Sequence, residues 1–288
     1  MSAETTKKEV GLIGIGLLGT ALAERMLSNG FAVFGYDPSV AAAMRITTLG
    51  GRAATSITDV GKQCSTIVLC LPDSDVVDEV IQKLSHAIGS GTLLIDTTTG
   101  DPARTIETSK QLADTGIDLV DAAVLGSSEV VRQGDGVLMV GASDTAFAAC
   151  SQLLKSIGPT VYHLGMTGSG QQMKLVANLV LGLNRAVLAE GLHFARSIGL
   201  DMSMVLSILK SGATWSRVMD AKGRKMVDAD FEPQARLSQH LKDVRLILSH
   251  AGEAGSQLPL SELHRLLLEQ VEQDGGGDLD NSAIIQAW

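Results

Sequence analysis

The feature that most constrains the fold is a set of three glycines near the start of the chain. Gly14, Gly16 and Gly19 stand in the spacing GxGxxG, after a β-rich run and at the start of a helical pattern. The first glycine permits a tight turn, the second lets the backbone approach a pyrophosphate, and the third lets the helix pack on the strand. The pattern therefore predicts a dinucleotide-binding loop. Its predicted cofactor-binding positions are Gly14, Ile15, Gly16, Leu17, Leu18 and Gly19.

A second β-rich run ends in Asp37, close to the expected distance of about 20 residues from the glycines. A carboxylate there would accept hydrogen bonds from the ribose hydroxyls and repel a 2′-phosphate, which favours NAD over NADP. Because Asp37 precedes Pro38 and a helical pattern, it is also predicted as a helix N-cap, and the two roles can hold at once. Arg45 and Arg52 are the only nearby basic residues for a phosphate, so NAD is the preferred cofactor and NADP the alternative.

The first half of the chain alternates short β-rich runs with helical patterns, as βαβ units of a mostly parallel sheet do. Seven strands are predicted, at residues 10–15, 32–36, 66–71, 92–95, 117–120, 137–140 and near 160–163. The helical patterns between them begin near Leu17, Ser39, Ser74, Pro102 and Ser143. This order predicts an α/β, doubly wound Rossmann domain over residues 1–165.

The second half, residues 166–288, shows only helix-period segments, and glycines are expected to break them at Gly199, Gly212, Gly223, Gly255 and Gly275. The first segment, from about Ser169 to Ser197, predicts a long helix that joins the two halves. We therefore expect an all-helical second domain for substrate binding and oligomerisation.

Composition narrows the function classes. The 288-residue chain has a formal net charge of -9 with mixed signs and only 3% aromatic residues, which disfavours a nucleic-acid surface. The polar start has no signal-peptide core, and no apolar run of membrane-spanning length lacks a charge or turn signal, so we expect neither secretion nor a membrane. The three cysteines fit neither a disulfide framework nor a zinc site, and a cytoplasmic location and no metal are expected.

One lysine, Lys174, interrupts the apolar pattern of the long predicted helix, with Asn178 one turn later and Arg185 three turns later. A lone lysine on such a helix ordinarily lays its stem on the core and its ammonium in water. Alternatively, a lysine that apolar neighbours partly desolvate has a lowered pKa and can donate or accept the proton that accompanies hydride transfer. Asn178 would then hold the lysine or the substrate.

Six stretches together resemble the β-hydroxyacid dehydrogenases, the group of 3-hydroxyisobutyrate dehydrogenase, tartronate semialdehyde reductase and plant glyoxylate reductase. They are GLIGIGLLGTALAERMLSNGFAVFGYD, LPDSDVV, IDTTTGDP, DAAVLGS, GSGQQMKLVANL and LKDVRL. Their order and spacing match across nearly the whole chain. The resemblance implies a Rossmann domain like that of 6-phosphogluconate dehydrogenase, a helical second domain, and a homodimer or homotetramer.

The resemblance also assigns roles to single residues. It implies Lys174 as the general acid/base and Asn178 as its partner at the active site. Thr99 would contact the cofactor near the nicotinamide, Leu71 and Pro72 would line the adenosine side, and Lys242 would close over cofactor and substrate. The ordinary alternatives are a capped strand end at IDTTTGD and a solvated face at Lys242 and Asp243.

The substrate positions implied by the resemblance are Leu125, Gly126, Ser127, Lys174 and Asn178. Gly126 and Ser127 would offer backbone amides and a hydroxyl to a substrate carboxylate. The chain departs from the family pattern at Leu125, where a serine is usual, at Ser127, where a glycine is usual, and also at Ala123 and Ala177. Loss of that hydroxyl suggests a less polar substituent on the substrate.

These features favour an NAD(P)-dependent oxidoreductase acting on a small hydroxy acid or its semialdehyde or keto-acid partner. An imine reductase that uses NADPH shares the architecture but usually lacks a lysine at position 174. A dinucleotide-sensing protein without catalysis is the third reading, since a fold does not fix an activity.

Overall fold

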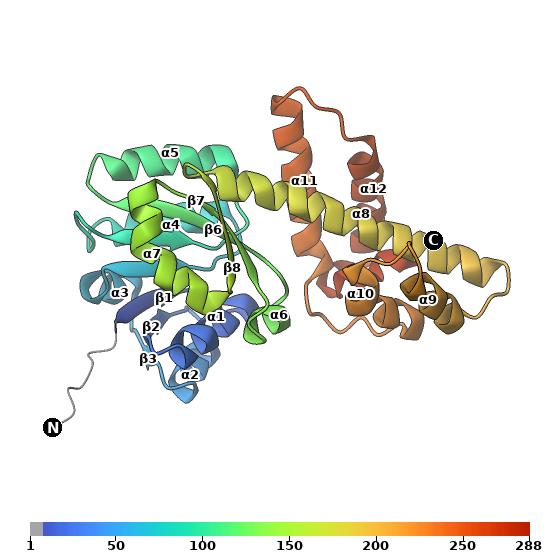
Figure 1. The fold of residues 1–288 in the computed structure, drawn as a ribbon, viewed down its shortest axis with the longest axis horizontal. Helices are drawn as coiled ribbons and strands as arrows, with labels where there is room; N and C mark the ends of the chain where they lie inside the picture. Colours follow the sequence, from blue (N-terminus) through green and yellow to red (C-terminus); the bar gives the residue numbers. More distant parts are fainter. Residues whose placement is uncertain (1–7) are drawn as a thin grey trace. The chain divides into compact units, whose positions relative to one another are not determined.

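The computed structural model describes residues 8–288, which fall into two compact units divided between Lys174 and Leu175. The first unit is an eight-stranded sheet with helices on both faces (Figure 1). Its strands are β1 Glu9–Ile13, β2 Ala32–Tyr36, β3 Arg52–Ala53, β4 Thr66–Leu69, β5 Leu93–Asp96, β6 Asp118–Leu125, β7 Val137–Gly141 and β8 Thr160–Gly165. Its helices are α1 Leu17–Ser28, α2 Val40–Thr48, α3 Ile57–Gln63, α4 Ser74–Leu84, α5 Pro102–Ala113, α6 Ser128–Arg132 and α7 Asp144–Ile157.

The strand order is β3-β2-β1-β4-β5-β6-β7-β8, and all neighbours are parallel except β6 and β7. The chain starts in the middle of the sheet and winds first to one side and then to the other. The carboxyl ends of β1 and β4 flank the point where the winding reverses, which is where open α/β sheets bind ligands.

Alternate residues of each strand feed two separate cores, because side chains along a strand point to opposite faces. In β4, Val68 belongs to the core that contains α1 and α7 residues, whereas Ile67 and Leu69 belong to the core under α3 and α4. Two apolar faces covered by helices make the unit doubly wound, as predicted.

The long helix α8, Ser169–Ser197, has the predicted bounds and continues from the first unit into the second. The second unit is otherwise helical. Its remaining elements are α9 Met202–Ser211, α10 Arg217–Asp228, α11 Leu237–Glu253, α12 Pro259–Gln273 and the 3-10 segments η1 Gly276–Asp278 and η2 Asn281–Ala287. The predicted fold class is confirmed: a Rossmann-like sheet unit followed by a long helix and a helical unit.

One predicted helix break is wrong. Gly223 lies inside α10, where a Cβ atom would come 2.5 Å from a methyl group of Leu206. The glycine therefore serves close packing of α9 on α10 and does not end a helix. The short elements β3, α3 and α6 were not predicted, and β6 continues to Leu125, well beyond its predicted end at residue 120.

In the second unit α8 has one buried face, which includes the charged Arg185, and one exposed face that carries apolar side chains. Gly182, Arg185 and Leu192 lie on its buried face, whereas Val180 and Val187 are exposed. By length and composition alone, α8 would also suffice to cross a membrane, a property that it shares with core helices of soluble proteins. Lys174 and Arg185 are the charges predicted to interrupt it.

Candidate functional site

The glycine loop between β1 and α1 leaves one open position on its backbone. Gly14 has φ +96°, and a Cβ atom on it would lie 2.2 Å from the carbonyl oxygen of Cys70. A Cβ atom on Gly19 would lie 2.0 Å from the carbonyl oxygen of Gly14. No heavy atom outside the loop lies within 4 Å of the Cβ position at Gly16, and no side chain caps the amino end of α1. These exposed amides at a helix amino terminus suit the pyrophosphate of a dinucleotide.

Asp37 follows β2 and holds this loop. Its Oδ2 accepts a hydrogen bond from the backbone N–H of Ile15 at 2.7 Å, and its Oδ1 accepts one from Ser39 N–H at 2.8 Å. The alternative of Asp37 as an N-cap is wrong, because α2 starts at Val40 and Ser39 is its N-cap residue. The bond to Ser39 is the Asx turn that an aspartate makes with the backbone two residues on.

The two arginines named as phosphate ligands lie in different surroundings. Arg45 Nη2 donates to the carbonyl oxygen of Ile15 at 2.8 Å, so its guanidinium contacts the glycine loop. Arg52 pairs with Glu9, the first residue of β1, at 2.7 Å and stacks over Phe34. Only Arg45 therefore stands beside the predicted ribose site.

The loops after β4 and β5 form the next part of this edge. The Oγ1 of Thr98 accepts a hydrogen bond from Leu71 N–H at 3.1 Å, which ties the two loops together. Thr98 and Gly100 are buried, whereas Thr99 between them is half-buried. The predicted cofactor residues Leu71, Pro72 and Thr99 thus lie on two adjacent loops of the first unit.

The amino end of α8 sits on a buried carboxylate of β6. The two oxygens of Asp121 accept hydrogen bonds from Gly168 N–H at 2.6 Å and from Gln171 N–H at 2.7 Å. At Gly170 a Cβ atom would lie 2.4 Å from the carbonyl oxygen of Met139. The glycines of the GSG stretch therefore let the helix end approach the strands closely enough for the carboxylate to bind it.

Lys174 of α8 is half-buried. Its Nζ donates a hydrogen bond to the carbonyl oxygen of Val124, near the end of β6, at 2.6 Å. The next residue along the strand, Leu125, begins the predicted substrate stretch. Gly126 has φ +144°, and the Oγ of Ser127 accepts the N–H of Val130 as the cap of α6. The structure thus brings Lys174 together with the residues before this stretch, and the Ser127 hydroxyl already has a capping partner.

Asn178 and Lys242 lie in the second unit. Asn178 is buried, and its Nδ2 donates to Oδ2 of Asp243 at 2.9 Å; Lys242 Nζ lies 3.2 Å from the other carboxylate oxygen. A buried Asp243 contradicts the alternative of a solvated face at this pair. Asp243 was not among the residues predicted for the site, although it stands in the LKD stretch.

Two buried aspartates lie side by side in the sheet register, Asp96 at the end of β5 and Asp121 in β6. Burial raises the pKa of Asp96 to about 7 and that of Asp121 to about 6. The pKa of the Cys70 thiol beside the glycine loop is raised to about 12 by burial, which leaves it a poor nucleophile. Among residues 8–288, no cluster of three or more His, Cys, Asp and Glu side chains forms a metal site.

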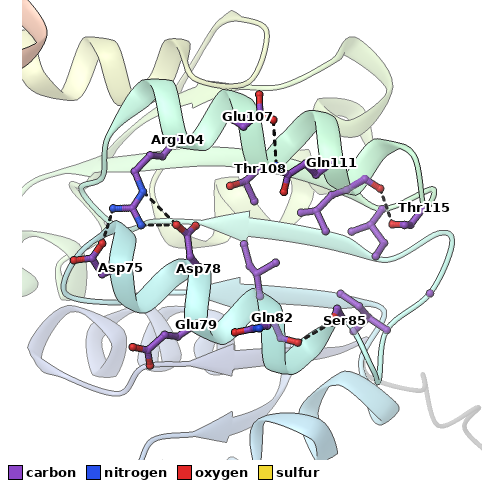
Figure 2. A pocket seen from close by; sticks show the side chains of 15 residues that line it. Asp75, Asp78, Glu79, Gln82, Ser85, Arg104, Glu107, Thr108, Gln111 and Thr115 are labelled. Carbon is purple, nitrogen blue, oxygen red and sulfur yellow. Dashed lines mark hydrogen bonds and ion pairs between the residues drawn. The ribbon is translucent and has the colours of Figure 1, made fainter.

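A surface groove of about 750 Å³ opens between α4 and α5 (Figure 2). Arg104 of α5 reaches across to Asp75 and Asp78 of α4, and Glu79 and Glu107 stand on the walls. None of the predicted site residues lines this groove. The groove is therefore separate from the candidate site at the glycine loop.

Comparisons with protein families match both parts of the chain. Residues 9–165 match the NAD-binding domain of 6-phosphogluconate dehydrogenase, and residues 168–288 match the NAD-binding family of NADP-dependent 3-hydroxyisobutyrate dehydrogenase. The 2-(hydroxymethyl)glutarate dehydrogenase of Eubacterium barkeri is 31% identical over 97% of this chain and 94% of its own. The 2-hydroxy-3-oxopropionate reductase of Escherichia coli (strain K12) is 27% identical over 97% and 96%.

A solved structure extends the likeness to three dimensions. The crystal structure of 3-hydroxyisobutyrate dehydrogenase from Salmonella typhimurium superposes with a TM-score of 0.92, covers 97% of this chain and 99% of its own, and is 23% identical. At that identity the superposition supports the fold, while the sequence matches above support the family.

Proposed function

The chain belongs to the β-hydroxyacid dehydrogenase family, and from this premise we propose that it interconverts a small hydroxy acid with the corresponding semialdehyde or keto acid, using NAD(P). The observation that carries the proposal is Lys174, which a short hydrogen bond holds at the end of β6 beside the predicted substrate stretch. Relatives that act on hydroxymethylglutarate and hydroxyoxopropionate support a small, branched or α-functional carboxylate as substrate.

The residues of the first unit fit the cofactor. The open backbone at Gly16 and the uncapped start of α1 would bind the pyrophosphate, and Asp37 the adenosine ribose. Leu71 and Pro72 would line the adenosine side, with Thr99 nearer the nicotinamide. Bound NAD(P) would supply or accept the hydride.

We assign the proton to Lys174. When the substrate alcohol is oxidised, the neutral amine accepts the hydroxyl proton as the hydride leaves the carbon; in reduction, the ammonium returns a proton to the oxygen. The bond to the Val124 carbonyl fixes the Nζ atom in space, so that the amine does not need to be ordered during the reaction. The family resemblance implies Asn178 as a partner of Lys174 and Lys242 as a cofactor ligand.

The substrate carboxylate is assigned to the backbone around Gly126 and Ser127. Because the Ser127 hydroxyl caps α6, the amides contribute more to this site than the hydroxyl. Leu125 in place of the usual serine favours an apolar substituent near the reacting carbon.

The test is nicotinamide absorbance with purified protein and the variants Lys174→Ala and Lys174→Arg. We expect kcat to fall by about 10²- to 10⁴-fold in both, because a positioned general acid/base contributes on that order. Dinucleotide affinity should remain within about twofold. Lys155→Ala, an exposed lysine on α7, is the matched control and should retain the wild-type rate.

Near-normal turnover by Lys174→Ala would contradict the proton-transfer role. The substrate panel consists of hydroxyisobutyrate, glycerate, tartronate semialdehyde, glyoxylate, succinic semialdehyde and a cyclic imine. Turnover of the imine alone would assign the chain to imine reduction, and dinucleotide binding without any turnover would assign it to sensing.

We propose NAD as the preferred cofactor, with NADP as the alternative. Asp37 accepts two hydrogen bonds from the backbone beside the glycine loop, and an acidic side chain at the ribose site disfavours a 2′-phosphate. Arg45 is the one basic group beside it that would favour that phosphate. The same assay, run with NAD and with NADP, measures whether Asp37 or Arg45 decides the cofactor preference.

We further propose a homodimer or homotetramer. Four exposed apolar side chains follow the outer face of α8 in the second unit, namely Val176, Val180, Val187 and Phe194. Apolar residues on both faces of a helix are stable in water only if both faces pack against other protein. A second copy of the chain carries the same apolar face and could pack against this one. A cytoplasmic location is proposed alongside, since Cys64, Cys70 and Cys150 are free thiols.

A further inference from the structure

Gln171, in the first turn of α8, is fully buried, and its side-chain amide binds the residues on both sides of Thr99. Its Oε1 accepts the backbone N–H of Gly100 at 3.1 Å, and its Nε2 donates to the carbonyl oxygen of Thr98 at 2.7 Å. Its own backbone N–H donates to Asp121 at 2.7 Å. One amide thus pairs with the donor and the acceptor on either side of Thr99, much as a neighbouring strand would.

The β5–α5 loop, to which Gln171 is hydrogen-bonded, also forms hydrogen bonds with β4 and α4. The Oγ1 of Thr97 donates to the carbonyl oxygen of Leu69 at 2.7 Å, and Asp101 N–H donates to the Oγ of Ser74 at 2.8 Å. Residues 96–98 and 100 are buried. The contacts from β4, α4 and α8 therefore leave Thr99 as the half-buried residue in a loop that is otherwise fixed.

The same side chain stands one turn before Lys174. Residues three apart on a helix lie on neighbouring positions of one face, so Gln171 and Lys174 share a side of α8. Lys174 Nζ contacts Val124, and Gln171 N–H contacts Asp121, three residues earlier on β6. The first two turns of α8 are thus joined to β6 at two points and to the β5–α5 loop by the Gln171 amide.

We propose that Gln171 is a positioning residue that holds the Thr99 loop and Lys174 in a fixed relation to each other. The inference rests on the proposed function, because Thr99 and Lys174 acquire their roles from it. Removing the amide would leave a buried N–H and a buried C=O without partners, which the loop can remedy only by moving toward water. Thr99 would then move away from the position in which α8 holds it.

The experiment compares Gln171→Met, which keeps the length but removes both hydrogen bonds, with Gln172→Met on the exposed side of the same turn. Gln171→Met should lower kcat/KM by about 10- to 100-fold, with kcat more affected than KM, and should shift the pH profile of kcat. Gln172→Met should behave as wild type. Gln171→Glu keeps an acceptor for Gly100 N–H and loses the donor to Thr98, so it should recover part of the rate.

A second measurement does not depend on turnover. In the wild type the Gly100 amide should resist hydrogen exchange, and in Gln171→Met it should exchange at least tenfold faster, while dinucleotide affinity falls severalfold. Slow exchange at Gly100 in Gln171→Met, or an unchanged kcat and pH profile, would overturn the proposal. If the wild type turns over no substrate in the panel, the proposed function fails, and exchange and affinity still decide the role of Gln171.

Discussion

At the scale of single residues, the sheet carries an unusual pair of acids. Asp96 and Asp121 are neighbours in the register of β5 and β6, and both are nearly inaccessible to water. The pKa of Asp96 is raised to about 7, chiefly by burial; hydrogen bonds from Thr98 oppose the rise, and the nearby charges of Asp121 and Asp78 add to it. The folded protein therefore holds a proton on Asp96 at a pH where the unfolded chain has released it.

This proton predicts the direction of a pH effect. Between about pH 4 and pH 7 the folded state binds more protons at Asp96 than the unfolded state, so this residue lowers the free energy of unfolding as the pH rises. Asp96→Asn keeps an acceptor for Thr98 N–H and removes the ionisation. The variant should gain stability relative to the wild type as the pH rises from 4.5 to 7.5, which urea unfolding at several pH values measures. A constant difference across that range would contradict the raised pKa.

The sequence predicts the residues of this site unevenly. Gly14, Gly16 and Lys174 could be predicted as site candidates because a backbone turn, an exposed amide or a charge on an apolar helix leaves a local pattern. Asp121 and Gln171 were not predicted as candidates because their hydrogen-bond partners lie about 50 and more residues away. Both stand inside motif stretches that the sequence does single out, and that is the signal by which they were detectable.

At the scale of elements, long periodic segments were predicted accurately. The bounds of α8 agree with the expected Ser169 to Ser197, and all five predicted helix starts of the first unit agree to within one residue. The short α3 and α6 have fewer than eight residues each, too few for a helical period to be recognised. Gly223 shows that a glycine within a helical pattern can mark close helix packing and not a break.

Two glycines, Gly170 at the start of α8 and Gly252 near the end of α11, are expected to respond in opposite ways to substitution by alanine. Gly170→Ala would place a methyl group 2.4 Å from the Met139 carbonyl oxygen, so it should lower stability by about 1–3 kcal/mol. Gly252 lies near the end of α11 with no atom within 4 Å of its Cβ position, and Gly252→Ala should add up to about 1 kcal/mol through helix propensity. Thermal unfolding measures both. A melting temperature for Gly170→Ala at or above the wild-type value would contradict the close approach of Gly170 to the Met139 carbonyl oxygen.

At the scale of the whole molecule, the outer face of α8 predicts association. Val187, which is 67% exposed, stands in the middle of this face, and Val187→Asp should halve the mass of the particle in sedimentation velocity. Met44→Asp places the same charge at an equally exposed residue of α2 and should leave the mass unchanged. A monomeric wild type would contradict the proposal, and wild-type binding to lipid vesicles would assign the face to a membrane.

The glycine loop carries a consequence for kinetics. Both backbone groups of Ile15 are engaged before any nucleotide arrives, its N–H by Asp37 and its carbonyl by Arg45. A loop shaped in advance loses little freedom when it captures a ligand. Capture of the nucleotide should therefore proceed in a single concentration-dependent phase, without a slow rearrangement after the encounter, and differences in affinity between nucleotides should arise chiefly from how fast each one departs.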